Sequence, residues 1–209
     1  MFGIINFELF LMTALLLNLT PGTDTMYIVS RTISQGRQAG VFSALGITTG
    51  TIFHTLLAAF GLSIILMNSV LLFNAIKIIG AIYLVYLGLN MIITKSLKKE
   101  NRSIPTEFTK RKIFIQGMIT NITNPKVALF FIAFLPQFIN PGTASPIPFI
   151  ILGLTFTFTA GVWCLAIAYF SSLTTKKIRN NATAGMLLNK ITGIVFIAMA
   201  VSLFKTKAT

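Results

Sequence analysis

Residues 18–27 read NLTPGTDTMY and interrupt a stretch that is otherwise apolar. They contain a helix breaker, Pro21, followed by Gly22, and a cluster of threonines around one carboxylate, Asp24. Proline removes a backbone donor, and irregular backbone is tolerated inside a bilayer only where it is buried in protein or lines a wet cavity. We therefore expect this break to face the interior of the molecule.

A second break repeats the first in the other half of the chain. Residues 121–126 read NITNPK, and Pro125 follows Pro21 at a distance of about half of the 209 residues. Lys77 and Lys190 form a second matching pair. Each precedes a glycine by three positions, near the start of the last hydrophobic segment of its half of the chain. Two matched, broken segments in corresponding halves indicate a transport site at the interface between two repeats.

The composition predicts a membrane protein. Hydrophobic residues make up 55% of the chain, charged residues only 10%, and the mean hydropathy is +0.84. Such a chain cannot cover a water-exposed surface with polar groups. The net charge of +13 would suggest nucleic-acid binding in a soluble domain, but the basic residues here gather in short loops between apolar segments. We therefore expect an all-α, multi-pass protein whose surface is solvated by lipid, with no nucleic-acid partner.

Six apolar segments are long enough to span a hydrocarbon core of about 30 Å, which requires about 20 residues. They are residues 4–29, 39–67, 70–93, 113–138, 148–173 and 186–204. We expect residues 1–93 to form one three-helix repeat, 94–112 a basic cytoplasmic linker, and 113–209 a second three-helix repeat. Because three is odd, the two repeats are inverted relative to each other. Residues 30–38 are expected to form a polar, basic loop.

Basic residues outside the spans concentrate in the first, third and fifth loops. They are Arg31, Arg37, Lys95, Lys98, Lys99, Arg102, Lys110, Arg111, Lys112, Lys176, Lys177 and Arg179. The second and fourth loops contain none, and the C-terminal tail contains Lys205 and Lys207. Since cytoplasmic loops carry an excess of lysine and arginine, the odd loops are expected in the cytoplasm and both termini outside.

Asp24 is the acid that lies within a predicted span and away from its ends. A charged side chain in that position is costly unless it is paired, hydrated or protonated, so it indicates function by default. A carboxylate there can carry a proton or a substrate amine. The alternative is a structural N-cap, because an Asp that follows Pro-Gly can bind the free amides of the next helix.

Lys126 follows Pro125 directly, where the second broken helix restarts. Its ammonium could meet a substrate carboxylate or Asp24, and snorkelling to the headgroups is the alternative. The neighbouring amides and hydroxyl either bind a polar ligand or satisfy the broken backbone. The residues expected to bind substrate or a proton are Thr20, Pro21, Gly22, Thr23, Asp24, Asn121, Thr123, Asn124, Pro125 and Lys126.

The single histidine and the single cysteine predict no catalytic or metal chemistry. His54 is interpreted as a hydrogen-bonded contact between helices, and Cys164 as a small buried hydrophobe without a disulfide partner. Neither a metal-ligand set nor a nucleotide-binding motif is apparent, so no cofactor is expected. Gly46 and Gly50 form a GxxxG pattern that is typical of close contacts between membrane helices.

With both breaks in hand, the chain resembles the LysE/RhtB family of amino-acid exporters nearly from end to end. The first-half signature is similar to residues 21–26 (PGTDTM), 34–40 (SQGRQAG) and 44–50 (ALGITTG), and the second to residues 124–138 (NPKVALFFIAFLPQF). One departure is Thr23, where many members carry a second proline. The resemblance implies six helices in the bacterial cytoplasmic membrane and export of an amino acid or derivative against proton entry.

Other functional classes are less well supported by the residues. A membrane redox carrier needs paired thiols, and an intramembrane hydrolase needs a nucleophile motif or paired acids. A divalent-cation exporter of related fold is the alternative to an amino-acid exporter, although it would be expected to gather acids, cysteines or histidines in its spans. We expect a transporter rather than an enzyme, with a neutral amino acid and protons as its partners, and a homodimer is a plausible assembly.

Overall fold

The computed structural model describes residues 2–64, 70–93, 109–140 and 145–173, together with position 143 and six isolated positions between 190 and 201. The helical elements are α1 (Phe7–Leu19), α2 (Thr23–Gln35), α3 (Arg37–Leu57), the π-helical turn η1 (Ala58–Leu62), α5 (Val70–Ile93), α6 (Lys110–Ile122), α7 (Pro125–Leu129), the π-helical turn η2 (Phe130–Phe134), the 3-10 turn η3 (Leu135–Phe138) and α8 (Ile147–Leu173). Apart from turns and one isolated antiparallel bridge between Ile4 and Ile139, these described residues are helical. The all-α prediction is confirmed for them.

Among the described residues, two continuous helices are long and apolar enough to cross a membrane, namely Arg37–Leu62 and α8. A third span is possible if α6 and Pro125–Phe138, which meet at an angle of 47°, are taken as one broken helix. Many large apolar side chains are exposed, including Leu71 at 83% and Phe158 at 73%. Soluble monomers rarely expose so much apolar surface, which fits a surface in contact with lipid. Most of the span expected at 186–204 lies outside the described residues, so the six-helix inverted repeat stays a prediction.

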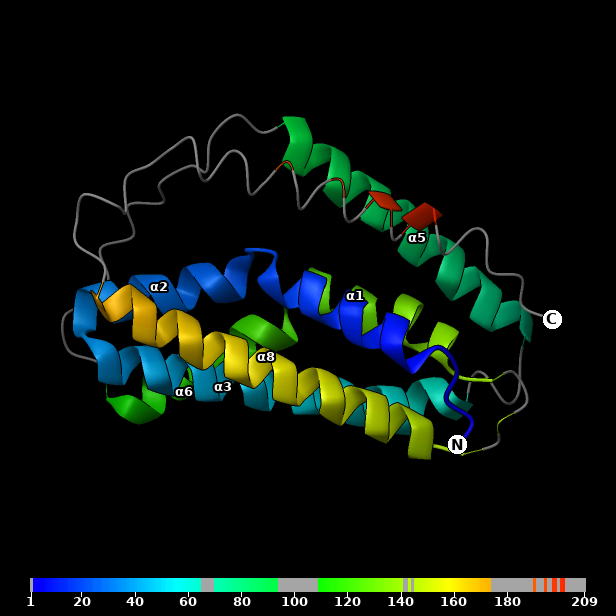
Figure 1. The fold of residues 1–209 in the computed structure, drawn as a ribbon, viewed down its shortest axis with the longest axis horizontal. Coiled ribbons are helices and arrows are strands. Elements are labelled where there is room, and N and C mark those ends of the chain that lie inside the picture. The colour runs from blue at the N-terminus through cyan, green and yellow to red at the C-terminus, as the bar shows by residue number, and fades with distance from the viewer. Residues whose placement is uncertain are drawn as a thin grey trace.

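The first broken helix consists of α1 and α2, which follow one another along the long axis with the Pro21-Gly22 break between them (Figure 1). The loop predicted for residues 30–38 is wrong, because α2 continues to Gln35 and α3 begins at Arg37. The connection is Gly36, whose φ of 88° suits glycine. The polar residues at the end of α2 remain helical. Arg31, one of them, is buried and donates a hydrogen bond to Gln116 of α6, a contact that a solvent-exposed loop would not provide.

The second broken helix consists of α6 and the segment from α7 to η3. It begins at Lys110, so the last three residues of the expected 94–112 linker are helical, while residues 94–108 lie outside the described part. It runs antiparallel to the first broken helix. Ile5 donates a backbone hydrogen bond to Phe138 at one end, and Tyr27 reaches Ile113 at the other. The two breaks therefore lie side by side near the middle of the molecule.

Close packing of α3 against α6 positions the polar residues near the breaks. A Cβ added at Gly46 would lie 2.1 Å from the Phe114 carbonyl oxygen, and one at Gly50 would lie 2.8 Å from Asn121. Only glycine allows the two backbones to approach so closely, as the GxxxG pattern predicts. The approach brings Thr51 and His54 within reach of Asn121. α8 runs along both α1 and α2 and covers the breaks from another side (Figure 1).

The two broken helices are joined at one end by aromatic side chains, which we call the aromatic end. Its members are Phe10, Phe130, Phe131, Phe134, Phe138 and Phe156, and all are buried. Phe130 lies at the centre, with its ring centroid 4.6 Å from that of Phe156 and 6.0 Å from that of Phe10. Helix association in lipid depends on such tight packing, because lipid tails are as apolar as the side chains.

The opposite end is joined by polar side chains, and we call Tyr27, Arg31, Ile113 and Gln116 the polar end. The Tyr27 hydroxyl donates to the Ile113 carbonyl at 2.9 Å, and Arg31 Nη2 donates to Gln116 Oε1 at 2.6 Å. The Arg31 guanidinium also lies 5.3 Å from the centre of the Tyr27 ring. These contacts join α2 to α6 where both helices approach the basic residues that begin α6.

Candidate functional site

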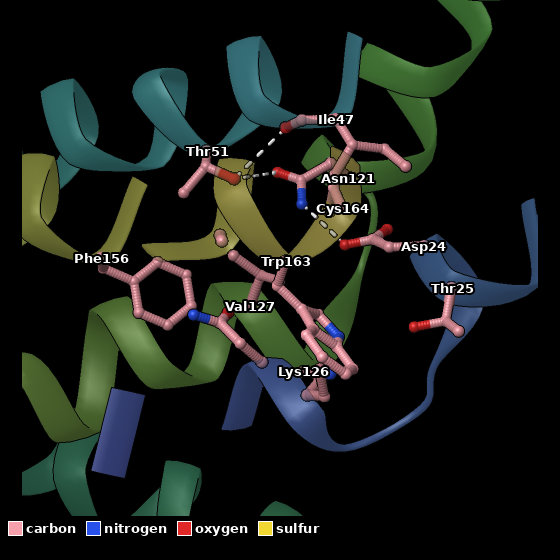
Figure 2. Close-up of a pocket in the computed structure, with 12 residues that line it drawn as sticks. Asp24, Thr25, Ile47, Thr51, Asn121, Lys126, Val127, Phe156, Trp163 and Cys164 are labelled. Carbon is pink, nitrogen blue, oxygen red and sulfur yellow. Dashed lines mark hydrogen bonds between the residues drawn. The ribbon is translucent and has the colours of Figure 1, made fainter. Parts of the chain in front are cut away.

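The two breaks enclose a small cavity of about 30 Å³ (Figure 2). Its walls come from α2, α3, α6, α7 and α8 and from the last turn of α1. The lining residues are Asn18, Asp24, Thr25, Ile47, Thr51, Asn121, Lys126, Val127, Phe156, Ala160, Trp163 and Cys164. A volume of this size holds about one water molecule. The site is therefore nearly closed in this conformation, with polar groups from both halves of the chain facing it.

Asp24 lies in the first turn of α2, and its side chain points across the cavity. Gly22 occupies the N-cap position, and no side chain caps this helix. Asp24 Oδ2 instead accepts a hydrogen bond of 2.8 Å from Asn121 Nδ2 (Figure 2). Asp24 Oδ1 is buried and has no hydrogen-bond partner. The side chain thus does not act as the N-cap that was the structural alternative. Its Oδ1 makes no direct hydrogen bond, and the Asn124 side chain lies beside the carboxylate and stabilises its charge.

Asn121 connects Asp24 to α3. Its side chain is almost completely buried, its Nδ2 donates to Asp24, and its Oδ1 lies 3.4 Å from the Thr51 hydroxyl. Its main-chain carbonyl accepts from the Asn124 amide at 2.9 Å and also lies 3.2 Å from His54 Nε2. His54 also stacks on Phe131. The histidine is therefore a hydrogen-bonded contact between helices, as expected, and it adds a side-chain contact to a carbonyl beside the second break.

Lys126 contacts the first break rather than the Asp24 carboxylate. Its Nζ donates to the carbonyl oxygens of Thr20 at 2.8 Å and Leu17 at 3.1 Å. In a continuous helix the Leu17 carbonyl would accept from residue 21, but Pro21 has no N–H. The Thr20 amide donates to the Leu17 carbonyl at 3.2 Å, and the Lys126 ammonium is a second donor whose charge complements the C-terminal end of α1. Lys126 thus links the two halves and does not snorkel.

The other predicted residues divide into capping, backbone and surface roles. Asn124 is the N-cap of α7 and accepts from the Lys126 amide at 3.0 Å, with Pro125 in the first helical position. Asn124 Nδ2 is buried without a partner. The Thr20 hydroxyl bonds back to Leu16. Pro21 and Gly22 shape the backbone of the first break, and Thr23 and Thr123 are exposed and do not line the cavity.

Sequence reasoning missed the contribution of α8. This helix is apolar and unbroken, so neither a charge nor a proline marked its cavity-lining residues Phe156, Trp163 and Cys164. Cys164 is the small buried residue that was expected. Trp163 is the one tryptophan in the chain, and its indole Nε1 is buried without a hydrogen-bond partner. A lone tryptophan in an apolar span was the available signal, since its N–H needs a partner when buried.

A second, more open groove adjoins the cavity. Its volume is about 280 Å³, and it lies between α2 and α8. Its lining residues are Thr25, Val29, Trp163, Ala166, Ile167, Phe170 and Ser171. Thr25 and Trp163 line both the cavity and the groove. The polar cavity is therefore continuous with a largely apolar groove.

The chain is similar in sequence to several known proteins. The chain is 35% identical over 197 residues to the "Uncharacterized membrane protein YrhP" of Bacillus subtilis, covering 90% of this chain and 93% of that protein. It is 28% identical over 203 residues to a "Leucine efflux protein" of Klebsiella pneumoniae and 26% identical to one of Enterobacter sp.. Both of those alignments cover 97% of this chain and 96% of the relative. No solved structure matches the chain.

The sequence profile of the LysE type translocators matches residues 15–207, which include both breaks and every helix that lines the cavity. The match covers most of the chain, and the resemblance noted from residues 21–26 and 124–138 is confirmed. The chain belongs to the LysE type translocator family.

Proposed function

We propose that this protein is a secondary active exporter that moves a small neutral amino acid out of the cell in exchange for protons. The observation that carries the proposal is the position of Asp24, a carboxylate with one buried oxygen that makes no hydrogen bond, in the wall of a small cavity between two broken helices. Relatives over nearly the full length are named leucine efflux proteins, which supports an amino acid as the substrate.

The transport cycle follows from the position of Asp24. A carboxylate that faces the two solutions alternately can bind a proton on one side and release it to bind a substrate ammonium on the other. Asp24 has one oxygen held by Asn121 and one oxygen available for this exchange. Lys126 keeps the two halves in register while its positive charge lies near the cavity. The site then needs no cofactor.

The proposal is tested by Asp24→Asn in proteoliposomes with an imposed proton gradient. Asparagine keeps the size and can still accept from Asn121, but it cannot exchange a proton. We expect a folded protein whose concentrative transport of leucine falls to the background of empty liposomes. Glu8→Gln is the matched control, because Glu8 is an exposed acid in the first turn of α1, and its transport should equal wild type.

Two results would reject the proposal in different ways. Normal gradient-driven transport by Asp24→Asn would remove Asp24 from the mechanism. A wild-type rate that no proton gradient alters would replace antiport by facilitated diffusion, and a response to divalent cations alone would favour the cation exporter.

The proposed topology places both termini outside and residues 94–112 in the cytoplasm, with residues 1–93 and 113–209 as inverted repeats. A cysteine introduced at Arg102 in a Cys164→Ser background should react with an impermeant maleimide in inside-out vesicles and not in intact cells. Labelling in intact cells would contradict this orientation. Homodimerisation is a further expectation, which cross-linking in membranes tests.

A further inference from the structure

We infer that the indole N–H of Trp163 binds the carboxylate of the substrate while Asp24 binds its ammonium group, and that the groove between α2 and α8 receives an aliphatic side chain. This inference rests on the proposed function and names the substrate class of the same site. It assigns to Trp163 a role in positioning and selecting the substrate.

The first step is the pair of open polar atoms. Asp24 Oδ1 is an acceptor and Trp163 Nε1 is a donor, and both are buried without hydrogen-bond partners. Both residues line the same cavity, and Figure 2 draws the Trp163 ring in the middle of the site with Asp24 and Thr25 beside it. A buried polar atom without a partner is unfavourable, so a ligand that supplies one is favoured. An α-amino acid presents an ammonium donor and a carboxylate acceptor on one carbon atom.

The second step concerns the other positive group in the site. The Lys126 ammonium already donates two hydrogen bonds to the carbonyls of Thr20 and Leu17. It has three N–H groups, so at most one remains for a ligand. Lys126 therefore supplies a favourable charge for a carboxylate, while Trp163 supplies a directed donor.

The third step is the continuity of the cavity with the groove. Thr25 and Trp163 belong to both, and the groove extends from them past Val29, Ile167 and Phe170. None of the described residues that line it is charged. A cationic or anionic side chain would lose its hydration there without gaining a partner, whereas an aliphatic one would not. With the α-carbon between Asp24 and Trp163, the groove is the adjoining space that can receive the side chain.

The test separates the proposed carboxylate and ammonium contacts by two leucine analogues, each of which lacks one of these groups. Purified protein is incubated with radiolabelled leucine and with unlabelled 3-methylbutylamine, which has no carboxylate, or 4-methylpentanoate, which has no ammonium group. Trp163→Phe keeps the ring and removes the N–H. We expect it to weaken leucine binding about tenfold, as for a lost hydrogen bond to a charged group, and to leave 3-methylbutylamine within twofold. Asp24→Asn should weaken leucine and leave 4-methylpentanoate within twofold.

The wild-type protein provides a second measurement that does not depend on folding of a variant. Because Trp163 is the one tryptophan, indole emission reports this site directly. Leucine should change the emission in a saturable way. Unchanged leucine binding by Trp163→Phe, equal weakening of leucine and the amine, or an emission that leucine does not alter would each overturn the assignment.

The groove is tested by Val29→Phe, which narrows it. We expect leucine binding to weaken about tenfold while alanine, which needs no groove, stays within twofold. Met26→Phe on the exposed side of the same helix is the matched control and should change neither. If wild-type protein transports hydrophilic amino acids and not leucine, this inference fails and the proposed export function stands. If it transports no amino acid, the proposed function itself fails.

Discussion

The same pair of antiparallel broken helices is joined by opposite chemistry at its two ends. At the aromatic end, six buried phenylalanines pack together, with Phe130 at their centre. At the polar end, Tyr27, Arg31 and Gln116 form a few directed hydrogen bonds. Polar contacts can be replaced by water one at a time, whereas an aromatic cluster loses its packing as a unit. We therefore expect the polar end to open at a lower free-energy cost than the aromatic end.

The largest expected effect is at the aromatic end. Phe130→Ala removes the ring that contacts Phe10, Phe131, Phe134 and Phe156 and leaves a cavity among these rings. We expect the free energy of unfolding in detergent to fall by about 3–5 kcal/mol, the usual range for a buried phenylalanine. Thermal unfolding followed by circular dichroism measures it.

Phe158→Ala is the matched control, because Phe158 is 73% exposed on α8. Its effect should be below about 1 kcal/mol, as for a surface substitution. Equal effects of the two variants would show that the aromatic cluster does not hold this end together.

The next largest effect is expected at the junction between the two ends. Lys126→Met keeps the length of the side chain but removes the ammonium that satisfies the Leu17 and Thr20 carbonyls. Hydrogen bonds to charged groups contribute about 1.5–3 kcal/mol, so we expect a loss of about that size in the same unfolding experiment. Lys110→Met, which removes an ammonium 5.6 Å from the Phe42 ring, should cost less than about 1 kcal/mol. A Lys126→Met protein as stable as wild type would mean that the Pro21 break is satisfied in another way.

The smallest effect on stability is expected at the polar end. Gln116→Leu removes the acceptor of the 2.6 Å Arg31 hydrogen bond and should lower the free energy of unfolding by about 1–2 kcal/mol. Its main consequence should be access to the cavity. Cys164 lines the cavity and is the one cysteine in the chain, so its reactivity reports opening without an introduced cysteine. In inside-out vesicles we expect an impermeant maleimide to react with Cys164 several-fold faster in this variant.

Gln137→Leu is the matched control at the other broken-helix end, where Gln137 bonds to the Ala133 carbonyl. It should leave the labelling rate from the cytoplasmic side unchanged. If the two variants react at the same rate, the polar contacts do not limit access and the contrast between the ends is structural alone.

Much of the candidate site could be predicted, because each helix break is marked by residues that are close together in the sequence. Pro21, Asp24 and Pro125 are conspicuous in apolar surroundings, and proline and a lone carboxylate have predictable effects in any membrane helix. The structure agrees with the expected contact role of His54 and places Asp24 beside Asn121 of the second break, while the binding role of Asp24 stays a prediction. The loop prediction for residues 30–38 was wrong. A run of polar residues is typical of a loop, and the sequence does not show that Arg31 forms a hydrogen bond with Gln116 of a distant helix.

The sequence by itself determined a lipid-solvated helical protein, two breaks half a chain apart and the carboxylate at the first of them, since hydropathy and proline act over short distances. The tertiary structure alone decided that Lys126 serves the carbonyls of α1, that Asn121 holds Asp24, and that Trp163 of an unmarked helix completes the cavity. These contacts join residues about a hundred or more positions apart. The pairing of donors and acceptors over such separations depends on how the helices pack. Local sequence patterns therefore do not predict it.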